Sequence, residues 1–407
     1  MRDHDVVIAG GGLTGLVLAR TLAGVFGRDA RIALLDAGGA AGRADPRSYA
    51  LSAGSRRLLE AVGIWSAVAG EAQPVSGIDI TDSSLTDAIR PILLSYDTAV
   101  AEGEPGMWIV PADALQRAAM AALAGVAGVT QISATATGLA ADASGVAVQL
   151  ADGRSLNAGL VVACDGRNSP LRTAAGIKTV DWRYEQTGIV TTVRHERPHG
   201  GHAVQHFLPG GPFAILPLTG NRACVTWTEE AGEAARILAL DDAGFLSELE
   251  KRFGHRLGAL ELAGPRGSWP LAMHLARELI APRFALAGDA ARGVHPIAGQ
   301  GLNLGLRDVA ALSECLVDAV RVGLDVGDAT ALERYARWRR FDGAASAAAF
   351  SALNALFSQD NALLRSVRDA GLGIVDRMPG LKRALVGEAA GLTGEVPKLL
   401  KGEALAI

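Results

Sequence analysis

Two glycine-rich stretches of this chain could present bare backbone to a ligand. The first, GGGLTG at positions 10–15, contains Gly10, Gly12 and Gly15 in the spacing G-x-G-x-x-G. In this pattern the first glycine permits a tight turn, the second lets backbone approach a pyrophosphate, and the third lets a helix pack on a strand. The N-terminus of the helix that follows would offer free N–H groups to the phosphates.

An acidic residue supports this interpretation. Val6 to Ala9 is a strand-like run, Leu16 to Leu22 continues as a helix, and Arg31 to Asp36 predicts the next strand. This βαβ unit places Asp36, 21 residues beyond Gly15, where its carboxylate can accept from ribose hydroxyls. An acidic residue there favours an unphosphorylated ribose, hence FAD or NAD over NADP. The alternative is a structural glycine turn with a solvated aspartate.

The second stretch, GDAARGVHPIAGQGLNLG, covers residues 288–305. A short apolar strand at 284–287 precedes it, and a helical pattern from Leu302 to Val322 follows it. Little in it could build a core, so it is either a long structural loop or a surface of bare backbone for a ligand. A third segment, CDGRNS at 164–169, ends another predicted strand.

The elements that must position these stretches change character along the chain. An antiparallel hairpin is expected around Pro209 to Pro212, inside a run of alternating residues from Gly188 to Thr228. Short strands are expected over 76–98, a strand over 155–166, and helices over 111–123, 245–253 and most of 332–400. Segments of the cofactor-binding type therefore enclose an antiparallel sheet, and two domains interleave in sequence.

The bulk composition excludes several classes of function. The chain has 407 residues and a formal net charge of −4 with no basic run, so no nucleic-acid partner is expected. Its three cysteines, Cys164, Cys224 and Cys315, are isolated, which is typical of reduced, intracellular proteins. The eight histidines form no metal-ligand cluster, so no metal is expected.

The N-terminus is acidic where a signal peptide would be basic, and no apolar run reaches the roughly 20 residues of a transmembrane helix. We expect a cytoplasmic protein, or one peripheral to the inner membrane.

Together the segments resemble one family. They are VVIAGGGLTG with Asp36, PRSYALS at 46–52, CDGRNSPLR at 164–172 and LAGDAARGVHPIAGQGLNLGLRD at 286–308. This set resembles the class A FAD-dependent aromatic hydroxylases. Within them it is most similar to the ubiquinone-biosynthesis hydroxylase family, whose C-terminal pattern resembles YARWRRFDG, ALNALFS and RDAGLGIVDRMPGLKRAL in this chain. The similarity covers nearly the whole sequence.

The resemblance implies a mixed α/β fold. A Rossmann-like FAD-binding domain of the para-hydroxybenzoate hydroxylase type would be interleaved with an antiparallel-sheet substrate domain and followed by a helical C-terminal tail. The expected boundaries are 1–75, 100–180 and 270–335 for the FAD-binding domain, 76–99 and 181–269 for the substrate domain, and 336–407 for the tail.

The resemblance also implies roles for single residues. Asp289 would bind the ribityl or pyrophosphate region of FAD, and Arg47 would contact the pyrophosphate unless it is a solvated surface arginine. Asp165 and Gly166 match a motif that contacts both FAD and NAD(P)H. Gln116 matches a family residue on the adenosine side, with an ordinary surface glutamine as the alternative.

The resemblance also implies a role for the second glycine-rich stretch, which is contact with the flavin ring. The backbone of Gly299, Gln300 and Gly301 would run against the isoalloxazine ring. The helix that begins at Leu302 and Asn303 would direct N–H groups to the pyrimidine edge, where a helix N-terminus stabilises the anion of reduced flavin.

Two residues of the same loop are candidates for the catalytic region. Pro296 would fix the loop near the substrate, and His295 would either orient the substrate or merely cap the loop. One departure is visible: this chain has Arg292 where the family commonly has histidine, which puts in doubt any acid–base role assigned there.

The implied activity is a monooxygenase that hydroxylates the aromatic ring of a polyprenylated phenol in ubiquinone biosynthesis. NAD(P)H would reduce FAD, and O2 would react to give a flavin C4a-hydroperoxide that the phenol attacks. No second G-x-G-x-x-G exists, so the nicotinamide cofactor would bind only transiently. The alternatives are a hydroxylase of a small soluble phenol and a non-catalytic carrier of prenyl lipids on the same fold.

The surroundings of the substrate are less defined by sequence. Apolar residues of the antiparallel sheet, with Val190, Phe207, Ile215 and Leu216 as candidates, would either line the pocket or form an ordinary sheet core. The tail carries basic residues among apolar ones, which suits an anionic membrane surface, a protein complex of ubiquinone biosynthesis, or simple packing on the FAD-binding domain. These basic residues are Arg337, Arg339, Arg340, Lys382, Arg383, Lys398 and Lys401.

Overall fold

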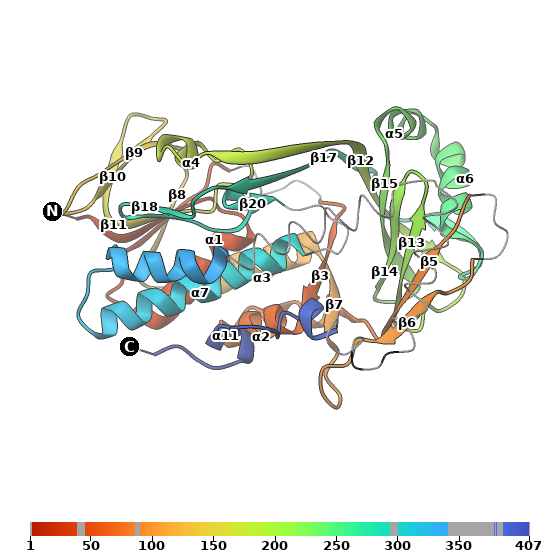
Figure 1. Ribbon diagram of the computed structural model, residues 1–407, viewed down its shortest axis with the longest axis horizontal. Coiled ribbons are helices and arrows are strands. Elements are labelled where there is room, and N and C mark those ends of the chain that lie inside the picture. Colours follow the sequence, from red (N-terminus) through yellow and green to blue (C-terminus); the bar gives the residue numbers. More distant parts are fainter. Residues whose placement is uncertain are drawn as a thin grey trace.

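The computed structural model describes residues 2–38, 45–85, 90–293, 300–340, 378, 380 and 386–406. Two sheet-containing parts lie beside each other, and the long strands β12 (Thr179–His195) and β17 (Gly267–Ala276) run between them (Figure 1). None of the described helices combines the length and apolar character needed to cross a bilayer.

The first part is built on a mostly parallel sheet. Among the described residues its strand order is β18-β19-β11-β1-β2-β8, with β10 and β9 added beside β11. The strands are β1 (His4–Ala9), β2 (Ile32–Leu35), β8 (Val129–Ile132), β9 (Ala136–Ala141), β10 (Val146–Leu150), β11 (Ser155–Ala163), β18 (Ile280–Ala281) and β19 (Phe284–Leu286). Strands β1, β2, β8, β11 and β19 pair in parallel, so their carboxyl ends meet at one edge.

Helices cover this sheet because each contributes an apolar stripe to a shared core. Helices α1 (Leu13–Phe26) and α7 (Gly301–Arg321) pack against each other beneath the sheet, and α3 (Ala112–Leu123) contacts α1 (Figure 1). The expected helix over 302–322 is therefore confirmed as α7. Strands β3 (Ser48–Ser52), β4 (Gln73–Pro74) and β7 (Met107–Pro111) form a small separate sheet. Strand β3 leads directly into α2 (Ala53–Ala61), and β7 leads directly into α3.

The second part is a mainly antiparallel sheet of order β20-β17-β12-β15-β14-β13-β5-β6. Its remaining strands are β5 (Gly77–Asp82), β6 (Leu94–Asp97), β13 (His202–Leu208), β14 (Gly211–Leu218), β15 (Arg222–Glu230), β16 (Leu260–Leu262) and β20 (Arg292–Gly293). The expected hairpin is confirmed as β13 and β14, joined by Pro209 and Gly210. One pair, β5 with β13, is parallel.

Helices α5 (Ala231–Leu238) and α6 (Asp242–Phe253) cover one face of this second sheet. Because successive strand residues point to opposite faces, Ile215 and Leu216 cannot share a face. Ile215 packs in the cluster that contains residues of α5 and α6, whereas Val190 and Leu216 face Ala50 and the small sheet. Ile215 therefore belongs to the sheet core beneath α5 and α6, which is one of the two alternatives expected for it, and it lies on the opposite face from Leu216.

A buried histidine lies on the helix-covered face. His206 is 7% exposed, and its Nδ1 lies 2.6 Å from Thr81 Oγ1. Burial, with the nearby positive charge of Arg90 and Arg256, lowers the pKa of His206 from 6.5 to about 4 against a hydrogen bond to the Phe253 backbone.

This pKa predicts a pH-dependent stability. Between about pH 6.5 and about pH 4 the unfolded chain binds a proton at His206 that the folded chain does not, so the free energy of unfolding falls as the pH drops through this window. The loss reaches up to ~3 kcal/mol. Urea unfolding of the His206→Asn variant should lack this part of the pH slope, whereas the exposed-site control His255→Asn should keep it. Equal slopes for all three proteins would contradict the assignment.

Candidate functional site

The glycine-rich turn after β1 is a place where backbone approaches backbone. Gly10 has φ of +116°, and a Cβ there would lie 2.3 Å from the carbonyl oxygen of Cys164. A Cβ on Gly15 would lie 1.9 Å from the carbonyl oxygen of Gly10. Gly12 differs, because a Cβ there meets nothing within 4 Å. The N-terminus of α1 follows with no capping side chain and no acidic residue in its first turn, so its N–H groups are available to an anion.

Asp36 and Gln116 flank this turn on one side. The carboxylate of Asp36 abuts Gly11, where a Cβ would lie 2.4 Å from its Cγ, and it accepts a hydrogen bond from the Gly38 N–H at 3.1 Å. Gln116 of α3 donates from Nε2 to the carbonyl oxygen of Gly11 at 3.1 Å. Both side chains are half-buried, so the structure brings these two candidates together at the glycine turn.

The segment after β11 forms the next wall. Gly166 has φ of +82°, a conformation that favours glycine. Burial raises the pKa of Asp165, and its Oδ1 is buried without a hydrogen-bond partner among the described residues. Arg172 ties this segment to the turn after β19 by donating to the carbonyl oxygens of Arg167 and Ala290, both at 2.8 Å.

The turn after β19 holds Asp289 in the 3₁₀ helix η3 (Gly288–Ala290). Gly288 has φ of +62°, and a Cβ there would meet Thr14 Oγ1 at 2.7 Å, so this turn packs on the first glycine turn. The side chain of Asp289 is exposed in this structure. Desolvation by the surrounding protein nevertheless raises the pKa of its carboxyl group. The positive charges of Arg47 and Arg167 oppose that rise in pKa.

The N-terminus of α7 lies below this turn. Gln300, Gly301 and Leu302 are half-buried, and the first turn of α7 contains no acidic residue. The side chain of Asn303 is engaged elsewhere: its Oδ1 accepts from Ser52 N–H at 2.9 Å, and its Nδ2 donates to the Ala50 carbonyl at 2.8 Å. Asn303 therefore fastens α7 to β3 through its side chain.

The side chain of Arg47 pairs with a neighbouring residue in the sequence, Asp45. It donates from Nε to Asp45 Oδ1 at 2.8 Å and from Nη2 to Asp45 Oδ2 at 2.6 Å, and it lies 5.8 Å from the ring centre of Tyr49. This pairing with Asp45 raises the pKa of Arg47. The three remaining candidates, His295, Pro296 and Gly299, lie outside the described residues.

A buried ionic cluster was not predicted from the sequence. Asp308 of α7 is fully buried and accepts from Arg292 Nη1 at 2.8 Å, Arg339 Nε at 2.7 Å and the Gly288 N–H at 3.0 Å. Arg292 is therefore a structural partner of Asp308 here. Arg339 is 0% exposed and pairs with α7, so of the alternatives given for the basic residues of the tail it fits packing on other elements and not contact with an anionic surface. The only sequence signal was the motif GLRD, which contains Asp308.

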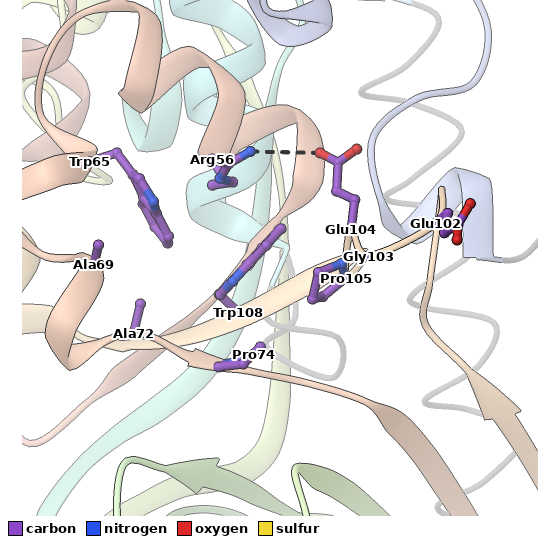
Figure 2. Close-up of a pocket in the computed structure, with 10 residues that line it drawn as sticks. All are labelled: Arg56, Trp65, Ala69, Ala72, Pro74, Glu102, Gly103, Glu104, Pro105 and Trp108. Carbon is purple, nitrogen blue, oxygen red and sulfur yellow. Dashed lines mark ion pairs between the residues drawn. The ribbon is translucent and has the colours of Figure 1, made fainter.

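A separate open hollow of about 630 Å³ lies beside the small sheet. Trp65 and Trp108 lie edge to face, with their ring centres 5.8 Å apart. Figure 2 shows Arg56 beside both rings and paired with Glu104. None of its lining residues is among the expected site residues. Its lining includes two carboxylates, Glu102 and Glu104, which would repel a diphosphate, so we place the site at the glycine turns.

The glycine turns fit a dinucleotide. An open turn with uncapped helix N–H groups suits a pyrophosphate, a strand-end carboxylate at Asp36 suits ribose hydroxyls, and the exposed carboxylate of Asp289 suits further hydroxyl donors. Among the described residues, no three His, Cys, Asp or Glu side chains gather in a way that could hold a metal ion.

Comparison with known proteins agrees with this geometry. A family model described as "FAD binding domain" matches residues 3–346. Ubiquinone hydroxylase UbiL of Rhodospirillum rubrum is 43% identical, covering 98% of this chain and 92% of that protein. The 3-demethoxyubiquinol 3-hydroxylase of Escherichia coli is 31% identical, covering 95% of this chain and 98% of that protein.

Solved structures share the fold. The p-nitrophenol 4-monooxygenase PnpA of Pseudomonas putida superposes with a TM-score of 0.79 at 19% identity, covering 97% of this chain and 100% of that chain. The expected mixed α/β fold with FAD as its cofactor is thereby confirmed. The chain belongs to the class A FAD-dependent aromatic hydroxylases and, within them, to the ubiquinone-biosynthesis hydroxylase family.

Proposed function

We propose that this enzyme hydroxylates the aromatic ring of a polyprenylated phenol in ubiquinone biosynthesis, with O2 and NAD(P)H as co-substrates. The observation that carries the proposal is the similarity to a ubiquinone hydroxylase over almost the whole chain. The match covers 98% of this chain, so it includes the strands of the second sheet, against which we propose that the substrate lies.

The cofactor roles follow from the geometry of the turns. The N–H groups after Gly12 would hold the FAD pyrophosphate, and Asp36 the adenosine ribose, with Gln116 beside it. Arg47 would add a cation at the pyrophosphate, and Asp289 would accept from the ribityl hydroxyls. When bound, FAD supplies the redox and oxygen chemistry.

The protein's own part is to position and to shield. The N-terminus of α7, from Gln300 through Asn303, would stabilise negative charge on the reduced ring. Asp165 and Gly166 would contact FAD and the transient NAD(P)H. His295 and Pro296 near the substrate, and Gly299 against the ring, remain predictions.

The substrate would lie against the face of the second sheet that α5 and α6 leave uncovered. Val190 and Phe207 are buried on this face, while Gln205, Ala214 and Thr226 are half-exposed in one row across β13, β14 and β15. We therefore propose that residues 76–99 and 181–269 form the substrate domain. Residues 1–75, 100–180 and 270–335 would form the FAD-binding domain, with 336–407 as a C-terminal region.

The location of the substrate suggests peripheral contact with the inner membrane from the cytoplasm, or with other proteins of the pathway. Arg337, Arg340 and Lys401 are exposed and could contact an anionic surface. Lys398 lies near Glu314 at 3.9 Å and is half-buried. Lys382 and Arg383 lie outside the described residues.

The activity can be tested directly with the purified, FAD-loaded protein. We expect a farnesyl-substituted phenol in detergent micelles to stimulate NAD(P)H oxidation and to gain one oxygen atom, which labelled O2 identifies by mass spectrometry. Lipid extracts of cells lacking the gene should accumulate an under-hydroxylated prenylphenol while ubiquinone falls.

Two results would contradict the proposal. Oxygen insertion into p-nitrophenol or 4-hydroxybenzoate, with no reaction of the prenylphenol, would favour the hydroxylase of a small soluble phenol. A protein that binds prenyl lipids but stays colourless after FAD is added would favour the non-catalytic carrier.

The glycine turn offers a matched pair of variants. Gly15→Ala places a methyl group against the Gly10 carbonyl, so it should lower the free energy of unfolding by about 2–3 kcal/mol. Gly12→Ala meets no protein atom, so its stability should fall by less than about 1 kcal/mol, the size of a weakened helix cap. Its FAD affinity should nevertheless fall by about tenfold or more, because the methyl group would face the pyrophosphate.

Urea unfolding and FAD titration of both variants check this pair. Wild-type FAD affinity in a folded Gly12→Ala variant would show that the pyrophosphate does not lie on this turn.

A further inference from the structure

His274 in β17 lies beneath the turn that carries Asp289, and its side chain is 1% exposed. Its Nε2 lies 2.7 Å from the carbonyl oxygen of Asp289. Because a carbonyl oxygen can only accept a hydrogen bond, Nε2 carries a proton and donates it. The imidazole is therefore fixed in orientation by the backbone of a residue in the cofactor site.

The other ring nitrogen of His274, Nδ1, makes no corresponding hydrogen bond to the described residues. Nδ1 of His274 is buried and has no hydrogen-bond partner among the described residues. A Cβ on Gly293 would lie 2.6 Å from Cε1 and 2.7 Å from Nδ1 of His274. This edge of the imidazole ring therefore packs directly against the backbone of β20. Among the described residues a proton on Nδ1 would find no acceptor, and burial also lowers the pKa of His274; both favour the neutral ring.

An unpaired buried nitrogen is unfavourable, and a phenylalanine ring would fill the same space without it. The one thing that a hydrocarbon ring cannot supply is the N–H donated to Asp289. The neighbouring peptides of the turn are held in the same way: Gly288 N–H donates to Asp308 at 3.0 Å, and the Ala290 carbonyl accepts from Arg172 at 2.8 Å. These bonds immobilise the turn and leave the carboxylate of Asp289 exposed.

We propose that His274 is a positioning residue of the flavin site. Its Nε2–H fixes the peptide of Asp289 so that the Asp289 carboxylate meets the ribityl hydroxyls of FAD. His274 acts through Asp289 and is not a catalytic residue. This inference rests on the proposed role of Asp289 in binding FAD.

Three variants separate the donated hydrogen bond from simple packing. The amide nitrogen of glutamine is separated from Cβ by as many bonds as Nε2 is in histidine. His274→Gln therefore keeps a donor within reach of the Asp289 carbonyl. In His274→Asn the amide reaches only the position of Nδ1, and His274→Phe keeps the ring without any donor. FAD release from each purified holoenzyme after dilution is followed by the recovery of flavin fluorescence, and thermal unfolding verifies that each variant is folded.

We expect FAD to leave the Asn and Phe variants about threefold to tenfold faster than the wild type, as the loss of one hydrogen bond predicts. The Gln variant should stay within about twofold of the wild type. Wild-type release from the Asn and Phe variants, or equal impairment of all three, would overturn the inference. Asp289→Ala distinguishes the levels of failure: faster release there, with unaffected His274 variants, refutes only the role of His274. Wild-type release from Asp289→Ala refutes the proposed role of Asp289 itself.

Discussion

The site depends on one steric constraint, which is the contact of three backbone turns at the carboxyl edge of the parallel sheet. Gly10 lies against the carbonyl of Cys164, Gly15 against the carbonyl of Gly10, and Gly288 against Thr14. No side chain larger than hydrogen fits between these groups. Because the turns touch, their peptide N–H groups and the N-terminus of α1 gather at one edge, and a diphosphate is the ligand that such an edge suits.

Backbone turns in such close contact must be fixed in position. Buried polar side chains fix the turn after β19 through hydrogen bonds to its backbone. Asp308 accepts from two arginines and from the Gly288 N–H, and Tyr335 donates to the Leu286 carbonyl at 2.7 Å. Burying a lone carboxylate would be strongly unfavourable, whereas one with three donors at good distances is tolerated. The chain therefore accepts charged groups in its core, and these groups fix the backbone of the turn after β19.

Much of this arrangement could be predicted from local sequence, because glycine spacing and strand-to-helix order are local features. The glycine turn, the strand ending at Asp36 and helix α7 all follow from patterns within about 30 residues. The positions of Arg339 and His274 could not, since their partners Asp308 and Asp289 come from other elements. The face of Ile215 could not be assigned from the sequence, because a continuous apolar run hides the alternation that distinguishes the two faces of a strand.

The segment around Pro46 links the cofactor turns to the second sheet. A Cβ on Gly267 of β17 would lie 2.7 Å from Pro46 Cγ, and Cys224 Sγ lies 3.9 Å from the Pro46 carbonyl oxygen. The next residue, Arg47, is near Asp289. A larger side chain at Gly267 would push Pro46 away from the sheet and carry Arg47 with it, since close-packed segments transmit displacement. If Arg47 contacts the pyrophosphate as proposed, the sheet proposed to receive the substrate would also help to place that cation, and substitutions made there to change substrate size would then also alter FAD binding.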